Sequence, residues 1–485
     1  MRRLDRTFFA VVILAVILAT GGCVPTPIPN TQATETIIAA KVFATLTAEA
    51  PMPKVGTPLV KKIMATLTPT ASPTGTKPPT PSPRPMKAAL TRKQVIEAYE
   101  QGQSLAGQNL AGLMLDQFEL PGIDLQGANM EGVSLKGANL ENANLADANL
   151  KGAVLDGANL EGARLDRANL EGVNLRAAGN LRGISLRKSA LQGVNLMECN
   201  LQGANLQGTN LQGANLTAIN LQDANLKRAN LKEADFYYSG VGIGSNLVRA
   251  NLEEAILTGA YLRRSDLQEA NLVRAQLQDA TLTRANLAGA NLEKANLQHA
   301  DLDNSILDNA NLKDADLQYA DLSGASLQNA NLSGATLEEA ELISAKLAEA
   351  DLRGATLQGA NLRQAKLQGA SLVGADLREA ILVRADLEGA DLRDTNLQGA
   401  NLYTVAGVCC AANLQRADLQ GANLQQVDLR KCDLREANLE GADLREAKLD
   451  EANLQQAKLK DANLLGASMA GAILPPDWQD QVADY

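Results

Sequence analysis

The residues with the greatest capacity for nucleophilic or metal chemistry are five cysteines and a single histidine, His299. A zinc site needs clustered Cys or His ligands, and a catalytic thiol needs a basic partner; the spacing of these residues provides neither. The sequence also shows no nucleophile–base pair, phosphate-binding glycine loop or paired catalytic carboxylates. We therefore expect no catalytic residues, no metal, no cofactor and no small-molecule substrate.

Composition indicates an unusual core. Aromatic residues make up only 3% of the 485 residues, so Leu and Ala must fill the interior. Residues 91–485 carry 35 Lys and Arg against 52 Asp and Glu, a net charge of −17. A nucleic-acid backbone is bound by clustered Lys and Arg, so the acidic balance argues against nucleic acid as a partner.

An apolar residue recurs at every fifth position from Leu105 onward, and 72 such positions can be counted to Leu474. A small residue, usually Ala, stands two positions earlier, and Asn or Asp stands one position earlier. On an extended segment, residues two apart share a face, so Ala and Leu point the same way. Because an internal repeat decides the architecture, the unit Ala-Asn/Asp-Leu-x-x organises residues 105–474.

The two residues after each Leu must turn the chain. Of 39 glycines, 29 fall two positions after the central apolar residue, which predicts a positive φ there, at the third position of a type II turn. Four extended sides and four turns close a square coil of twenty residues. The array then has about eighteen coils with Leu along its axis, an all-β solenoid in the form of a quadrilateral parallel β-helix.

This pattern resembles the pentapeptide-repeat family, and the resemblance covers residues 105–474. The resemblance implies a right-handed winding and an absence of catalysis. Cys199 and Cys432 occupy the Ala position of the unit, which predicts small buried side chains. His299 falls at an exposed corner position, where the sequence shows no partner for it.

The N-terminus reads as an export signal followed by a tether. Arg2, Arg3 and Arg6 precede a short apolar run, and residues 1–22 resemble a bacterial lipoprotein signal with Cys23 as the lipidated residue. Thr20 departs from the Leu usual in that family, and an ordinary cleaved signal is the alternative. Residues 23–90 are rich in Pro and Thr, which predicts a disordered linker. We expect a membrane-anchored lipoprotein facing the periplasm or the cell exterior.

Both ends of an open coil need covering. Thr91 and Gln94 have the spacing of a capping box, which predicts a capping helix within residues 91–104. Pro475 and Pro476 end the array, and the single Trp, Trp478, can cover it within a C-terminal cap of residues 475–485.

The fivefold phase breaks three times. The extra residue near Arg176–Asn180 predicts a simple corner bulge. Two longer breaks carry apolar and aromatic residues and are candidate interaction loops, which either contact a protein partner or fold back against the wall. Their candidate residues are Tyr237, Tyr238, Val241, Ile243, Tyr403, Val408, Cys409 and Cys410. Cys409 and Cys410 are adjacent, so a vicinal disulfide or a link between chains is open to them.

Taking every twentieth residue sorts the outward side chains by wall. One wall presents a candidate basic stripe, formed by Arg263, Arg264, Arg284, Arg363 and Arg384. The leading functional hypothesis is a non-catalytic, membrane-anchored scaffold or protein-interaction module whose partner the sequence does not identify. The alternative comes from the family resemblance, since some members mimic DNA and bind DNA gyrase: an acidic DNA mimic that binds DNA gyrase or another nucleic-acid-binding protein. The acidic balance allows this alternative, and the export signal opposes gyrase as the partner.

Overall fold

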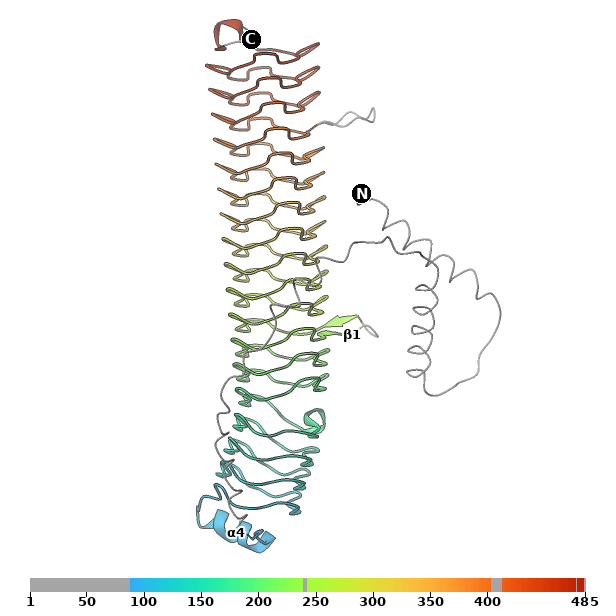
Figure 1. Ribbon diagram of the computed structural model, residues 1–485, viewed down its shortest axis with the longest axis vertical. Helices are drawn as coiled ribbons and strands as arrows, with labels where there is room; N and C mark the ends of the chain where they lie inside the picture. Colours follow the sequence, from blue (N-terminus) through green and yellow to red (C-terminus); the bar gives the residue numbers. More distant parts are fainter. Residues whose placement is uncertain (1–87, 239–241, 403–411, 477, 484–485) are drawn as a thin grey trace, which may run out of the picture. The chain divides into compact units, whose positions relative to one another are not determined.

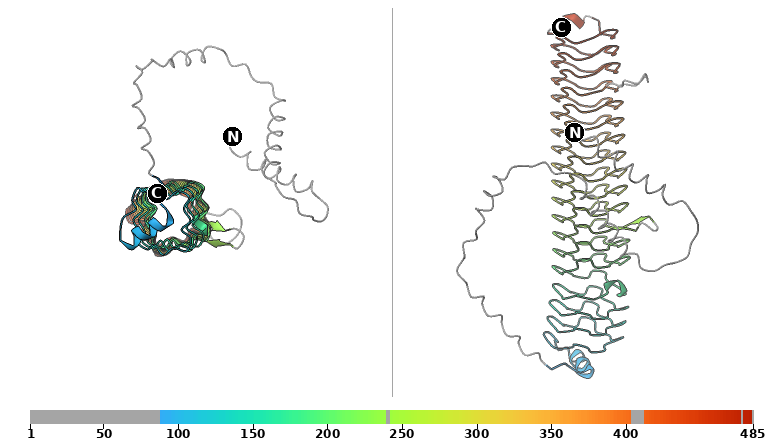
Figure 2. Two further views of the ribbon diagram at one scale, coloured as in Figure 1. Left: turned by 90° about the horizontal axis from the view of Figure 1, so that it is seen from below. Right: turned by 45° about the vertical axis from the view of Figure 1, so that its right-hand side comes forward.

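Parallel backbone bridges join residues twenty apart along the array. Asn109 pairs with Asn129, Asn129 with Asn149 and Asn149 with Asn169, and the other three sides show the same interval. The predicted circuit of twenty residues is therefore confirmed. The computed structural model describes residues 88–238, 242–402, 412–476 and 478–483, in which the coils stack into a tube (Figure 1) with four sides in cross-section (Figure 2, left). The predicted signal, Cys23 and residues 24–87 of the predicted linker lie outside the described residues. At the end of that predicted linker, Leu90 donates its backbone N–H to the carbonyl of Asn109 at 2.8 Å.

Few regular elements interrupt the coils. They are helix α4 (Arg92–Glu100), the 3-10 turns η1 (Leu175–Ala177) and η2 (Trp478–Asp480), and the short strands β1 (Tyr237–Tyr238) and β2 (Ile243–Gly244). Among the described residues, no helix combines the length and the apolar character needed to cross a bilayer.

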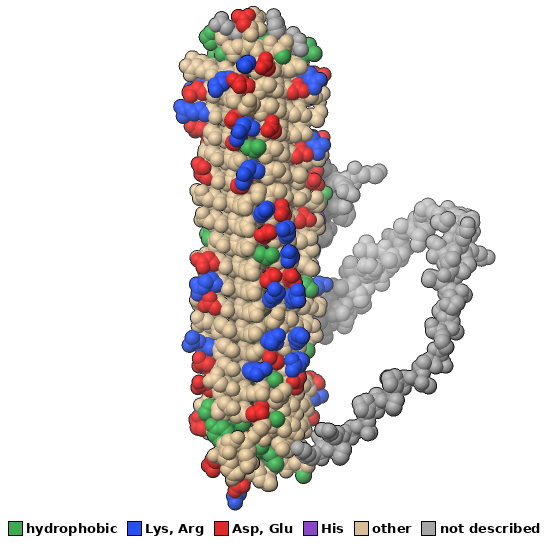
Figure 3. Space-filling model, turned by 90° about the vertical axis from the view of Figure 1, so that its left-hand side faces the viewer, with side chains coloured by type: hydrophobic (Ala, Val, Ile, Leu, Met, Phe, Trp, Pro, Cys, Tyr) green, Lys and Arg blue, Asp and Glu red, His purple; other side chains and the backbone are tan. Residues whose placement is uncertain are grey.

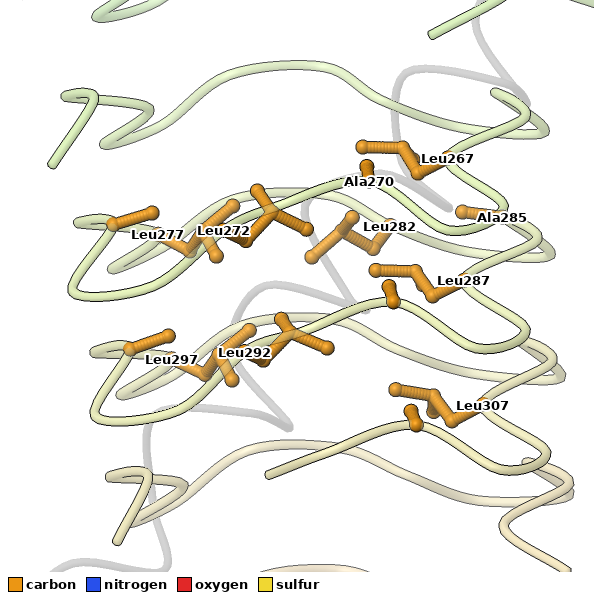
Figure 4. Close-up of a cluster of buried hydrophobic side chains, with 14 of the residues drawn as sticks. Leu267, Ala270, Leu272, Leu277, Leu282, Ala285, Leu287, Leu292, Leu297 and Leu307 are labelled. Atoms are coloured by element: carbon orange, nitrogen blue, oxygen red, sulfur yellow. The ribbon is translucent and has the colours of Figure 1, made fainter. Parts of the chain in front are cut away.

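Leucines from all four sides point into the axis of the tube. Leu267, Leu272, Leu277 and Leu282 belong to one coil, and their side chains converge with those of the next coil (Figure 4). All four are completely buried. Ala two positions earlier is buried as well, as at Ala270, because its small side chain lets the wall approach the axis. Burial of each Leu contributes about 1.5–3 kcal/mol before ordering entropy is subtracted.

The corners are type II turns. Ala128 donates its backbone N–H to the carbonyl of Leu125 at 3.0 Å, and Gly127 between them has φ +62°. All 29 glycines at this position of the repeat have positive φ, so the prediction from glycine phase is confirmed. A further 39 residues with side chains adopt the same conformation, which glycine counting does not reveal. The ladder imposes the conformation, since the turn residue also donates to the next coil, as Gly107 does to Gln126 at 2.8 Å.

Exchanging Gly and Ala at two successive corners should shift stability in opposite directions. Gly213 has φ +62° and open space around it, and Ala218 has φ +54°. A left-handed conformation costs a residue with a side chain about 1–2 kcal/mol, so Gly213→Ala should lower the free energy of unfolding by about that amount. Ala218→Gly should raise it by about 0.5–1 kcal/mol, because the greater entropy of unfolded Gly offsets part of the gain. Urea unfolding measures both, and shifts of the same sign would contradict this origin of the glycine pattern.

The Asn or Asp before each Leu supports the turn that follows. The Oδ1 atom of Asn149 accepts the backbone N–H of Lys151 at 3.3 Å. The side-chain amide of Asn149 donates to Oδ1 of Asn129 in the preceding coil at 3.0 Å. Similar amide ladders recur on other sides of the tube, for example between Asn311 and Asn291 at 3.0 Å. The preference for Asn and Asp therefore has two causes, one within a coil and one between coils.

Helix α4 lies at the start of the array and is shorter than the predicted range 91–104. Thr91 and Gln94 form both halves of the expected capping box. Gly102, with φ +65°, ends the helix because its N–H and that of Gln103 bond back to the last helical turn. Val95 is completely buried against the core of the array.

The last coil is joined by the C-terminal segment along one side. Asp461 donates its backbone N–H to the carbonyl of Gln481 at 2.7 Å, and Ala483 donates to Ala462 at 2.8 Å. Trp478, in η2, packs partly buried against the core. This contact agrees with the structural role expected for the single Trp.

The prediction of a simple bulge near Arg176–Asn180 is wrong. The chain forms the η1 turn there, and the coils on either side of it part (Figure 1). The bridge between Arg164 and Ser185 is intact, but no bridge of the described chain joins Asn169 to Ala190 or Asn174 to Asn195. One extra residue therefore interrupts the ladder over more than one side, because the residues beyond it no longer face their partners.

Candidate interaction surfaces

The first long break forms a hairpin that projects from the wall. Strands β1 and β2 pair antiparallel, with Tyr237 opposite Gly244 and Tyr238 opposite Ile243. The central apolar residue before the hairpin, Phe236, is completely buried. The repeat unit that precedes the hairpin therefore still places its central apolar side chain in the core.

Ser245 holds the base of the hairpin closed. Its hydroxyl is hydrogen-bonded to the carbonyl oxygens of Leu216 at 2.8 Å and Phe236 at 2.7 Å. Its backbone N–H donates to the hydroxyl of Ser265 in the next coil at 3.3 Å. Ser245 occupies an Ala position and is buried, so the polar side chain there is explained by the loop it ties down.

Two arginines of the predicted basic stripe bind the hairpin. The guanidinium of Arg263 lies 5.4 Å from the centroid of the Tyr237 ring, which is a cation–π distance. Nη1 of Arg264 donates to the carbonyl of Gly242 at 3.0 Å. Of the two alternatives for this loop, the structure places Tyr237 in contact with the wall, and a contact of the hairpin with a partner stays a prediction.

The remaining stripe arginines lie on the same side of the tube, in two groups. Bridges connect Tyr261 with Thr281 and, through successive coils, Asn361 with Ile381, so the corners that follow them share this side. Between Arg284 and Arg363 this side presents Asp303, Ser323 and Ile343 at the first turn position. The side chains of Arg284, Arg363 and Arg384 form no ion pair with any described residue. The stripe is therefore a basic group beside the hairpin and a second group four coils away.

Several predicted loop residues cannot be placed. Val241, Tyr403, Val408, Cys409 and Cys410 lie outside the described residues. Tyr238 and Ile243 enter the hairpin through their backbones.

His299 has a partner that sequence reasoning missed. Its ring stacks on that of Tyr319, with centroids 5.0 Å apart and planes inclined by 7°. The two residues are twenty apart, so they occupy the same corner of successive coils. The expectation of a histidine without a partner is wrong, and the twenty-residue interval is the signal that could have found it.

Cys199 and Cys432 are buried, as predicted, with 8% and 1% of their surfaces exposed. Burial raises the pKa of the Cys199 thiol to about 11 and that of Cys432 further, so both thiols stay protonated at neutral pH. Among the described residues, no group of His, Cys, Asp and Glu has an arrangement that could hold a metal ion.

Opposite charges stand next to one another on the outer surface (Figure 3). A recurrent source is the tripeptide Asp-Leu-Arg, in which both outward side chains meet above the buried Leu. Arg445, for example, donates to the carboxylate of Asp443 through Nε at 2.8 Å and Nη2 at 2.6 Å. The same pairing joins Arg353 to Asp351, Arg378 to Asp376, Arg393 to Asp391, Arg430 to Asp428 and Arg435 to Asp433. Some of the acidic residues are thus paired locally with arginine.

The Asp443–Arg445 pair predicts a stability change in acid. The hydrogen bond from Arg445, aided by Gln425, lowers the pKa of Asp443 to about 2, from 3.8. Because the pKa is lower in the folded chain, the stabilisation is complete above about pH 4 and is lost as the pH falls toward 2. The loss should stay below about 2 kcal/mol, since Arg445 is half-exposed and solvent screens the pair. Asp443→Asn should remove this part of the pH dependence in urea unfolding. Asp461→Asn, at an exposed corner without an ion pair in the described chain, is the control that should retain it.

Comparison with family models identifies the repeat. A model described as pentapeptide repeats matches successive segments from residues 105–142 to residues 447–474, and a model of a pentapeptide repeat region matches residues 275–352. No curated protein matches the chain.

Among solved structures, the chain is similar to HetL, a pentapeptide repeat protein involved in heterocyst differentiation regulation from the cyanobacterium Nostoc sp. strain PCC 7120. The identity is 31%, over 61% of this chain and 92% of HetL, with a TM-score of 0.16. A thylakoid-lumen pentapeptide repeat protein of Arabidopsis thaliana is 28% identical over 26% of this chain and 70% of its own, with a TM-score of 0.14. Full-length QnrB1, a plasmid-mediated fluoroquinolone resistance protein, is 14% identical over 56% and 92%, with a TM-score of 0.16.

Members of the matched family form right-handed quadrilateral β-helices, in agreement with the four-sided coils and the twenty-residue bridges described above. The family models match most of residues 105–474, and this match is independent of the likeness to the solved structures. The chain belongs to the pentapeptide-repeat family.

Proposed function

We propose that the chain is a non-catalytic scaffold that binds a protein partner outside the cytoplasm, anchored to a membrane through a lipid on Cys23. The observation that carries the binding role is the hairpin of residues 237–244. The wall around it repeats every twenty residues, and Ser245, Arg263 and Arg264 hold it in a fixed position. Side chains on a rigidly positioned loop are a common means of recognition.

The core supports a role without catalysis. Leucines from four sides fill the axis of the tube and are buried along it. With its interior filled, the tube acts as a rigid support that holds the groups on its outer surface at fixed distances. On this view the array has about eighteen coils, the number that follows from 72 units, and α4 and the C-terminal segment close its ends. Stacked coils have a fixed rise of about 4.8 Å, so surface groups keep constant separations.

Cell fractionation tests the anchored location. Labelled fatty acid should be incorporated into the wild-type chain and not into Cys23→Ser, and protease added to spheroplasts or whole cells should degrade the array. Soluble cytoplasmic protein without label would contradict the proposed location. It would leave the binding role to be judged by the next experiment.

Photo-crosslinking in cells tests the hairpin. A photo-reactive amino acid in place of Tyr238 should give a discrete covalent product with one protein. The same amino acid in place of Tyr319, which is 55% exposed on a different side of the tube, is the matched control and should give none. Equal products from both positions, or none from either, would refute a partner at the hairpin.

The gyrase alternative has one supporting observation, the acidic balance of residues 91–485. The Asp-Leu-Arg pairs place arginines beside aspartates and so interrupt the negative surface, whereas a DNA mimic needs continuous negative charge. We therefore favour the scaffold.

A further inference from the structure

The break at η1 leaves backbone groups of two facing coils without partners. Just before it, Leu165 donates its N–H to Ser185 at 2.7 Å, and after it Gly183 donates to Gln202 at 2.9 Å. Between these points several amides that would complete the ladder donate no backbone hydrogen bond within the described chain. Four of them belong to residues that line one place in the break: Leu170, Gly172, Ala190 and Asn195. Unpaired backbone groups on a strand edge are a template for another strand.

A cleft of about 700 Å³ lies at the same place. Its lining includes the inward side chains of both coils, Leu170 and Val173 on one and Leu191 and Val194 on the other. Val173 and Val194 are only partly buried, whereas counterparts in the middle of the array, such as Ala270 and Ala290, are completely buried. A volume of this size is within the range of ligand sites in proteins.

Two contacts across the break limit the opening. On one side the hydroxyl of Ser189 donates to the carbonyl of Leu165 at 3.2 Å. On the other, Arg176 and Glu198 form an ion pair at 3.0 Å. The coils are therefore tied together at both margins of the cleft, whose lining ends at Asn174 and Asn195. The ladder itself stays open one side further, because no bridge of the described chain joins Asn180 to Asn200.

We infer that this cleft binds an extended peptide segment of a partner protein by strand addition, with its backbone bonded to both coils. The segment would present a small residue and, two positions later, a Leu-like residue to the interior. Two features of the cleft select an extended peptide as its occupant. Both edges lack the strand partners that the intact sides have, and the side chains that line the interior between them are apolar. Backbone pairing supplies affinity in this mode of recognition, and alternate side chains supply specificity.

This inference rests on the proposed role in binding proteins and gives it a second, separate site. The hairpin and the cleft are formed by different coils, so hairpin crosslinking and peptide binding can fail independently. Their separate failure distinguishes an error about the cleft from an error about the function.

The probe is a labelled synthetic peptide with the sequence of residues 204–211, Ala-Asn-Leu-Gln-Gly-Thr-Asn-Leu, which contains the required spacing twice. Added to the purified full chain, it should bind saturably in fluorescence anisotropy. It should also slow amide hydrogen exchange at Leu170, Gly172, Ala190 and Asn195 at least tenfold. A peptide with proline in place of both Asn residues lacks the two backbone N–H groups that would donate to carbonyls of the preceding coil, and it should not bind.

Two variants of the chain test the site itself. Deletion of Gly179 removes the extra residue and should let the ladder close, with at least a tenfold loss of peptide affinity. Val194→Trp should fill the cleft and have the same effect if the deletion prevents folding. Ile256→Trp, an outward substitution on the wall in coils away from the break, is the control and should leave affinity unchanged.

Three results would overturn the inference. The first is the absence of protection at the four cleft amides. The second is protection confined to the last coil, which would show that the peptide adds to the end of the array. The third is undiminished binding to folded Val194→Trp.

Discussion

Leu287→Asp is expected to divide the array into two parts that unfold separately. Leu287 is completely buried on the axis, with coils of Leu above and below it. A carboxylate at that position would lose its hydration without gaining a partner, at a local cost of at least about 5 kcal/mol. Stability in a solenoid is a sum of terms within coils and between neighbours, so a single weak interface uncouples the two sides.

Two probes would reveal the division. The single Trp, Trp478, reports on the C-terminal part, and far-ultraviolet circular dichroism reports on all coils. In urea the two signals should change together for the wild-type chain and at different concentrations for Leu287→Asp. The neighbouring substitution Ala288→Asp, at a half-buried outward position, is the matched control and should leave a single transition. Coincident transitions in Leu287→Asp would mean that the array does not depend on an unbroken axis.

The periodic part of the fold can be predicted from sequence because the residue types in each five-residue unit determine the backbone conformation of that unit. Ala and Leu two apart share a face, and Gly in one phase marks the turn, so the square coil follows from spacing alone. The five-residue unit alone does not show the interactions between coils, which become visible only when residues twenty apart are compared. Asn149 bonds to Asn129, and His299 stacks on Tyr319, only because twenty residues return the chain to the same side.

The non-periodic parts could not be predicted for a different reason. The segments at 176–180 and 237–244 follow no repeat, so their conformation depends on local contacts that have no sequence signature. A single inserted residue predicts a bulge, but whether the next coil can shift to meet it depends on packing. The candidate sites lie in these breaks, since the regular wall provides one repeated surface and the interruptions make one place differ from another.

Tyr237 illustrates how a residue that the sequence marks as unusual can have a contact that the sequence does not show. Its aromatic character in a break marks it as unusual, but the Arg263 contact depends on which coil lies next to the hairpin. Arg263 and Arg264 share a wall with the other arginines of the basic stripe. Their positions at the base of the hairpin give them a role in holding it, which the phase of the repeat cannot show.

Gly244→Ala should release the hairpin from the wall while leaving the array folded. A Cβ atom at Gly244 would fall on the backbone of Arg264 and Ser265, which cannot move without breaking the ladder. Strand β2 would therefore retreat, and the contacts of Gly242 with Arg264 and of Ser245 with the preceding coil would weaken. Limited proteolysis within residues 237–244 should become at least tenfold faster, because protease cleaves segments that open locally.

The matched control for this prediction is Gly259→Ala. Gly259 has φ +65°, and its nearest neighbour would be Cγ of Glu233 at 3.6 Å, so the substitution adds turn strain without a backbone clash. It should lower the free energy of unfolding by about 1–2 kcal/mol and leave cleavage of the hairpin unchanged. Gly244→Ala should do the reverse, with faster cleavage and a nearly unchanged urea midpoint. If Gly244→Ala also abolishes crosslinking from position 238, a partner recognises the hairpin in its fixed position. If crosslinking persists after the hairpin is released, the hairpin side chains alone suffice for recognition. Arg263 and Arg264 would then hold the hairpin without contributing to binding.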